Sequence, residues 1–167
     1  MRRGRARQGQ GGGIALFIVF ASAVALEVAL TSQYEFGLAP CVLCLYQRIP
    51  YAIAIVLGLL ALPFGRGAIR PMLLVLVALA FAVNVGIAIF HAGVEWHWWA
   101  GLSGCTGGTA LPTNTQDLFA AMSTPAPARC DEAAWTLFGL SMAGYNVFAS
   151  AFLAIIAAIG ARRAFRD

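Results

Sequence analysis

The chain has 167 residues, of which 60% are hydrophobic and only 11% are charged. Soluble domains contain roughly 25% charged residues, so this composition argues against a protein that folds in water alone. The net charge of +4 does not indicate nucleic acid binding, because all 11 basic residues are arginines and most lie in three short polar segments. The composition predicts one compact membrane domain comprising residues 1–167.

Polar and apolar segments alternate along the chain in a pattern typical of a membrane protein with four spans. A helix needs about twenty apolar residues to cross a bilayer, and several runs approach or exceed this length. In chain order we expect a basic tail at 1–13, spans at about 14–32, 44–62, 72–90 and 135–159, and a second basic tail at 160–167. The outer loops are expected at 33–43 and 91–134, the second with a short amphipathic helix at 114–122. The predicted fold class is an all-α membrane protein, a four-transmembrane-helix bundle with one long outer loop.

The arginines predict the orientation of these spans. The N-terminal tail has four arginines, the loop between the second and third spans has two, and the C-terminal tail has three. In a four-span chain these segments lie on one side of the membrane, and arginine-rich segments remain in the cytoplasm. We therefore expect both termini in the cytoplasm and all four cysteines, Cys41, Cys44, Cys105 and Cys130, on the outer face. In a bacterial inner membrane that face meets the oxidising periplasm, where disulfides persist.

Cys41 and Cys44 form a Cys-X-X-Cys motif at the outer end of the second span. This spacing lets two sulfur atoms pair or separate with little backbone movement, which suits a redox cycle. Cys44 is expected in the first turn of the helix, where the helix dipole favours a thiolate, and Arg48 follows one turn later on the same face. Arg48 would then stabilise negative charge beside the sulfur. The alternative is that Arg48 anchors the helix end at the membrane surface.

Cys105 and Cys130 bracket the long outer loop. They could form a second redox-active pair, or a structural disulfide that only ties the loop down. A metal site built from all four thiolates is not expected, because zinc sites usually contain two close pairs, whereas 24 residues separate Cys105 from Cys130. If the cysteines formed only structural disulfides, the chain would be a membrane scaffold or a small transporter and not an enzyme.

Two further titratable residues lie in or beside the predicted spans. Glu27 lies within the first span, where an ionised carboxylate costs roughly 2.5–3.5 kcal/mol on insertion scales, so it should face the bundle interior or a polar partner. Roles in packing and in catalysis both remain open for Glu27. His91 lies at the outer end of the third span and is either an interface residue or a proton donor.

Residues 40–48, with the sequence PCVLCLYQR, resemble the signature of the disulfide bond formation protein B (DsbB) family. The resemblance covers nearly the whole chain. Four spans, Glu27 in the first span, His91 at the end of the third and an outer loop from Cys105 to Cys130 all fit the family layout. The resemblance implies a thiol oxidase of the bacterial inner membrane.

The resemblance further implies two redox-active disulfides, Cys41–Cys44 and Cys105–Cys130. The expected partner is a DsbA-like periplasmic thiol oxidase, which would attack the outer pair at Cys105. Cys130 would then relay the electrons to Cys41. The alternative is a related disulfide oxidase that serves a different thioredoxin-like partner.

The resemblance also implies a membrane quinone as electron acceptor, with ubiquinone favoured over menaquinone. Cys44 would be freed as a thiolate beside the quinone, and Arg48 and His91 would contribute to the quinone site. A quinone is needed because DsbA is itself strongly oxidising, near about −120 mV, so an ordinary thiol pool could not reoxidise it. No resident metal is expected.

Overall fold

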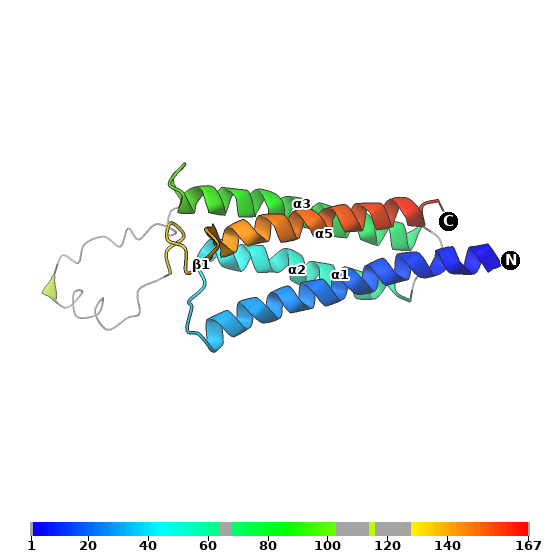
Figure 1. Cartoon of the computed structure of the whole chain (residues 1–167), viewed down its shortest axis with the longest axis horizontal. Helices are drawn as coiled ribbons and strands as arrows, with labels where there is room; N and C mark the ends of the chain where they lie inside the picture. Colours follow the sequence, from blue (N-terminus) through cyan, green and yellow to red (C-terminus); the bar gives the residue numbers. More distant parts are fainter. Residues whose placement is uncertain (1, 64–67, 103–113, 116–127, 167) are drawn as a thin grey trace.

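The computed structural model describes residues 2–63, 68–102, 114–115 and 128–166. Four long helices run side by side: α1 (Arg2–Tyr34), α2 (Val42–Ala61), α3 (Ile69–Glu95) and α5 (Met142–Ala164). Two short strands, β1 (Thr136–Leu137) and β2 (Leu140–Ser141), form an antiparallel hairpin directly before α5. Both termini lie at one end of the bundle, and the hairpin and the start of α2 lie at the other (Figure 1).

All four helices are long and apolar enough to cross a membrane. The candidate spans are Gly12–Tyr34, Val42–Ala61, Ile69–Glu95 and Met142–Ala164. Large apolar side chains such as Phe20 and Val83 point outward and are 67% and 62% exposed. A surface of this kind is suited to lipid, which is as apolar as the side chains themselves. The predicted fold class, an all-α membrane protein with four spanning helices, is confirmed.

Helix α5 begins later than the predicted start near Trp135, because the β1–β2 hairpin occupies the intervening residues. The two turn residues, Phe138 and Gly139, both have positive φ, 50° and 80°, as a tight type I′ turn requires. Ser141 then caps α5, since its Oγ accepts a hydrogen bond from the Gly144 N–H at 3.1 Å. The hairpin and the cap together set the start of the fourth span.

Other predicted boundaries also differ from the observed ones. α1 begins at Arg2, so the backbone of residues 2–13, predicted as a tail, is helical. Arginine, alanine and glutamine are good helix formers and continue the helix of the span. α3 continues to Glu95, which places His91 within the helix. The amphipathic helix predicted at 114–122 lies mostly outside the described residues.

The middle of the bundle is a close-packed apolar core. α3 packs against α2 and α5, and α1 packs against the same two helices. Phe81 and Leu74 of α3 are fully buried in this core. Glycine allows α1 and α2 to approach closely, because a Cβ at Gly58 would lie only 2.6 Å from Cγ2 of Val19. Several buried polar side chains lie nearer the hairpin end, at the start of α2 and the end of α3.

Candidate active site

Cys41 and Cys44 lie together at the start of α2. Cys41 is the N-cap residue, and its Sγ accepts a hydrogen bond from the Cys44 N–H at 3.2 Å. The two sulfur atoms are 2.8 Å apart, and both residues are free thiols. A disulfide bond is about 2.05 Å long, so a movement of less than about 1 Å would join or separate the sulfurs. The motif is therefore positioned for reversible disulfide formation.

In the reduced pair, the hydrogen bonds favour a thiolate at Cys41. The hydrogen bond from the Cys44 thiol is the largest cause that lowers the pKa of Cys41, from 9.0 to about 4; burial opposes it and His91 contributes further lowering. The sequence pattern had placed the thiolate at Cys44. The thiolate is favoured at Cys41 and not at Cys44 because the backbone N–H and the thiol of Cys44 both donate to Cys41 Sγ. The first turn of the helix therefore stabilises negative charge on the N-cap residue, Cys41.

His91 of α3 contacts the cysteine pair. Its side chain is buried, and its Nε2 lies 3.5 Å from Cys41 Sγ and 3.8 Å from Glu95 Oε1. Its Nδ1 lies 2.7 Å from the side-chain amide nitrogen of Gln47. The sequence left two roles open for His91, an interface residue or a proton donor, and the structure places its buried side chain against the cysteine pair. The carboxylate of Glu95 is held in turn by the Ser141 hydroxyl.

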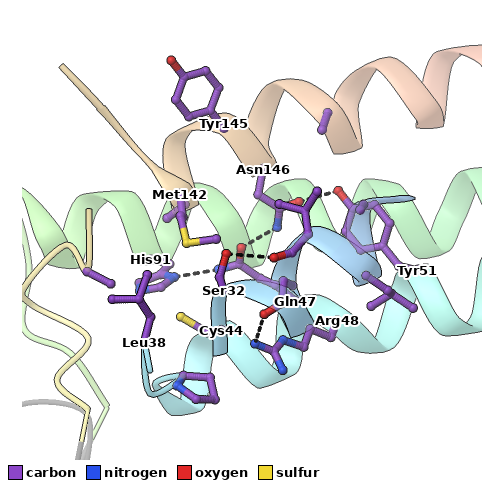
Figure 2. Close-up of a pocket in the computed structure, with 18 of the residues that line it drawn as sticks. Ser32, Leu38, Cys44, Gln47, Arg48, Tyr51, His91, Met142, Tyr145 and Asn146 are labelled. Atoms are coloured by element: carbon purple, nitrogen blue, oxygen red, sulfur yellow. Dashed lines mark hydrogen bonds between the residues drawn. The ribbon is translucent and has the colours of Figure 1, made fainter. Parts of the chain in front are cut away.

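A chain of polar side chains leads from His91 into the bundle. Gln47 Oε1 accepts a hydrogen bond from the Asn146 amide, and dashed lines in Figure 2 join His91, Gln47 and Asn146. Asn146 Oδ1 accepts from the hydroxyls of Tyr51 and Ser150. Gln47, Tyr51 and Asn146 were not predicted as site residues. The sequence feature that could have identified them is the presence of amide and hydroxyl side chains within apolar spans. Such side chains usually face the bundle interior and pair with one another.

A cavity of about 380 Å³ opens beside Cys44. Small-molecule pockets typically measure about 300–1,000 Å³ and combine apolar walls with a few polar groups. This cavity fits that description, because its walls are mainly apolar side chains of α1, α2 and α5 and of the segments before α2 and α5. Polar groups from Cys44, Gln47, Arg48, His91 and Asn146 also line it, and Figure 2 shows these residues around the pocket.

Arg48 lines the same cavity as Cys44, and its guanidinium is held by α1. Nη1 donates to Gln33 Oε1 at 2.7 Å, and Nη2 donates to the carbonyl oxygen of Ala29 at 3.3 Å. An arginine that only anchors a helix end extends its head group into water. Arg48 lies in the cavity wall, where its positive charge would be beside any molecule bound there.

Glu27 lies on the exposed side of α1. It was expected to face the bundle interior or a polar partner. Five residues separate it from the fully buried Ser22, which corresponds to a rotation of about 140° around the helix. The side of α1 that packs against α2 and α5 therefore does not include Glu27, and the structure does not place it in the site.

Cys130 is fully buried and belongs to a cluster with Cys41, Leu43 and Val94. It is disulfide-bonded. Cys105 lies outside the described residues, so the Cys105–Cys130 pairing stays a prediction. The cluster nevertheless brings one cysteine of the outer loop against the Cys-X-X-Cys motif, across 89 residues of sequence.

Cys41, Cys44 and His91 offer three potential metal ligands, whose ligand atoms all lie within 4.8 Å of one another. Two thiolates that share a tetrahedral zinc ion are about 3.8 Å apart, given Zn–S bonds of about 2.3 Å. The observed sulfur separation of 2.8 Å is closer to a disulfide than to that arrangement. The geometry of the cysteines thus suits redox chemistry better than metal binding.

Comparison with known proteins agrees with this chemistry. The profile of the family "Disulfide bond formation protein DsbB" matches residues 12–160. Disulfide bond formation protein B of Pasteurella multocida is 30% identical over 149 residues, which cover 87% of this chain and 83% of that protein. The protein of the same name from Xanthomonas campestris is 33% identical over 122 residues, 70% of each chain. No solved structure gives a significant match. The chain therefore belongs to the DsbB family of disulfide bond formation proteins, and is a multi-pass membrane disulfide oxidoreductase.

Proposed function

We propose that this protein reoxidises a DsbA-like periplasmic dithiol oxidase and passes the electrons through two cysteine pairs to a membrane quinone. One observation carries the proposal: Cys41 shares a buried cluster with Cys130 and is hydrogen-bonded to Cys44, and Cys44 lines the cavity. The three cysteines thus form a continuous route from the outer loop to a pocket. A structural disulfide would not need this alignment.

The proposed route balances in electrons and protons. The partner dithiol reduces the Cys105–Cys130 disulfide and is itself oxidised to a disulfide. The Cys105–Cys130 dithiol then reduces the Cys41–Cys44 disulfide by thiol–disulfide exchange, through a mixed disulfide between Cys130 and Cys41. Re-formation of the Cys41–Cys44 disulfide releases two electrons and two protons. These leave the protein at the cavity.

The cavity fits the head group of a quinone. A bound quinone would accept two electrons and two protons and carry them into the membrane. Arg48 would hold a carbonyl oxygen of the ring by its guanidinium and offset the negative charge that develops there. The apolar walls would exclude water, and Cys44 would be the cysteine nearest the acceptor. His91 lines the same cavity and would contribute a further polar group to the quinone site.

The proposed location is the bacterial inner membrane, with both termini in the cytoplasm and the cysteines facing the periplasm. Two features support this orientation. The arginine-rich segments include both termini, and the termini lie at the opposite end of the bundle from the cysteine pair. Disulfide chemistry also requires an oxidising compartment, which the periplasm provides.

The test separates the two cysteine pairs. Purified protein is incubated with reduced DsbA and a soluble ubiquinone, and oxidation of both proteins is followed. Cys105→Ser and Cys130→Ser should each abolish DsbA oxidation but leave the Cys41–Cys44 pair oxidisable by quinone. Cys44→Ala should abolish both reactions. Ser22→Ala, a buried change in α1 away from the cysteines, serves as the control and should retain the wild-type rates.

Each result has a clear meaning. Oxidation of DsbA at the normal rate by the Cys130→Ser protein would show that the relay is wrong and the outer disulfide structural. Quinone-dependent oxidation of the inner pair without any reaction with DsbA would favour the related oxidase with a different thioredoxin-like partner. Replacing ubiquinone with menaquinone in the same assay would identify the preferred acceptor.

A further inference from the structure

The imidazole of His91 has different neighbours at its two nitrogen atoms. Nδ1 faces the side-chain amide nitrogen of Gln47 at 2.7 Å, and an amide nitrogen can only donate. Nε2 faces Cys41 Sγ at 3.5 Å and Glu95 Oε1 at 3.8 Å, and both atoms are acceptors when ionised. A proton on Nε2 and a lone pair on Nδ1 satisfy both hydrogen-bond partners, Cys41 and Gln47, and the same proton lies on the side of the ring that faces Glu95.

The direction of the Gln47 amide is set by residues that do not touch His91. Gln47 Oε1 accepts from the Asn146 amide, which leaves only the amide nitrogen of Gln47 to face the ring. Asn146 is oriented in turn, because its Oδ1 accepts from the hydroxyls of Tyr51 and Ser150. Turning one amide alone would place two donors, or two acceptors, against each other. The two amides therefore share one direction, and in the structure each amide nitrogen points toward His91.

We propose that Gln47 and Asn146 are positioning residues that select one tautomer of the uncharged His91 ring, the one protonated on Nε2, with this proton directed at Cys41 Sγ. Gln47 and His91 are only 6% and 3% exposed, so water does not readily replace either partner. Hydrogen bonds in such a buried chain strengthen one another, and the loss of one member leaves its neighbour unpaired. Asn146 therefore acts on the ring through Gln47.

The catalytic consequence rests on the proposed function. When the Cys105 thiolate attacks Cys130 Sγ, a bond forms between these sulfurs and the bond between Cys130 and Cys41 breaks. The electron pair of the broken bond leaves on Cys41. The Nε2–H group of His91 stabilises this new thiolate by a hydrogen bond, and its proton stays on the ring. The opposite tautomer would present a lone pair to the departing thiolate.

The tautomer can be measured directly, because the sequence has only two histidines. The second, His97, is exposed and has a φ of 57°, a conformation that asparagine adopts readily, so His97→Asn leaves one ring to observe. The full-length His97→Asn protein is labelled with ¹⁵N-histidine in detergent micelles, at a pH where free histidine is neutral. Its NMR spectrum should show a proton on Nε2 and none on Nδ1.

Variants of Asn146 and Gln47 then test whether the direction of their hydrogen bonds sets the tautomer of His91. Asn146→Leu does not alter any atom that touches the ring, yet it should yield a mixture of tautomers. Gln47→Glu keeps the shape of the side chain but replaces its donor with an acceptor, so Nδ1 should become protonated. Ser22→Ala removes a buried hydroxyl that has no hydrogen-bond partner among the described atoms, and it should leave the spectrum unchanged. Asn146→Leu should also slow the release of Cys41 from the mixed disulfide about tenfold, the effect expected for one lost hydrogen bond.

A proton on Nδ1 in the parent protein would overturn the proposal. An unprotonated Nδ1 in the folded Gln47→Glu protein would do the same, even if Asn146→Leu failed to fold. The measurement needs neither quinone nor partner protein. A parent protein with the expected tautomer that fails to oxidise DsbA would therefore count against the proposed function and leave the assignment of His91 intact.

Discussion

Cys41 and Cys44 are three residues apart, yet the structure gives them different environments. Cys41 is buried and packs with Cys130, and its sulfur accepts hydrogen bonds from Cys44. Cys44 is partly buried and lines the cavity. This difference suits a pair in which Cys41 exchanges with the outer loop and Cys44 exchanges with the acceptor.

The lowered pKa of Cys41 predicts how the reduced pair responds to pH. A group with a lowered pKa keeps its charge down to a lower pH, so the Cys41 thiolate should persist at mildly acidic pH and be lost as the pH falls through about 4. The ultraviolet absorbance of the thiolate, at about 240 nm, can be followed in a Cys105→Ser, Cys130→Ser background. Cys44→Ala removes the main donor and should shift the midpoint toward the ordinary value of 9.0.

The control for this titration is Cys41→Ala in the same background. It should lose the thiolate absorbance at mildly acidic pH. If the absorbance remained in this variant and disappeared in Cys44→Ala, the thiolate of the reduced pair would belong to Cys44, as the sequence pattern alone suggests.

The contact between α1 and α2 depends on a glycine. A Cβ at Gly58 would lie 2.6 Å from Cγ2 of Val19 and 3.5 Å from the carbonyl oxygen of Ala15, whereas a Cβ at Gly86 of α3 would meet nothing within 4 Å. Alanine raises helix propensity by about the same amount at both positions, so a comparison isolates the steric effect. Gly58→Ala should be less stable than Gly86→Ala by about 1–3 kcal/mol, the usual cost of overpacking.

Thermal unfolding in detergent micelles, followed by circular dichroism, would measure this difference. Gly86→Ala is expected to match or exceed the melting temperature of the wild type. Equal melting temperatures for the two variants would mean that α1 and α2 can move apart at Gly58 without destabilising the protein. Their close approach would then not contribute to the stability of the bundle.

The arrangement of the whole molecule predicts which residues each side of the membrane can reach. Glu35 and Arg166 are exposed and lie just after α1 and α5, respectively. Helix α1 ends at the end of the bundle where α2 begins, and α5 ends at the other, where both termini lie (Figure 1). In a variant with the four native cysteines replaced by serine, Glu35→Cys should react with a membrane-impermeant maleimide in intact cells from which the outer membrane has been permeabilised. Arg166→Cys should react only after the inner membrane is also opened. The reverse pattern would place the cysteine pair in the cytoplasm and remove the basis of the proposed relay.

The apolar runs determined the number of spans, because only a helix of about twenty apolar residues satisfies its backbone in a bilayer. The Cys-X-X-Cys spacing by itself likewise indicated a redox pair, since residues three apart meet at the start of a helix. The start of the fourth span was predicted less well. Trp135 and its neighbours are apolar enough for a span, but the positive φ at Phe138 and Gly139 makes them a hairpin.

The tertiary structure alone decided which distant residues share the site. His91 lies 44 residues from Gln47, and Asn146 lies 99 residues from it, so no local pattern could pair them. The sequence showed that polar groups occur within the spans but not which ones face each other, because that depends on how each helix is rotated against its neighbours. The same packing placed Glu27 on the exposed side of α1, turned Arg48 toward α1 and brought Cys130 against Cys41. Sequence thus determined the chemistry available to this protein, and helix packing determined where that chemistry meets, because side chains on different helices are brought together only by the fold.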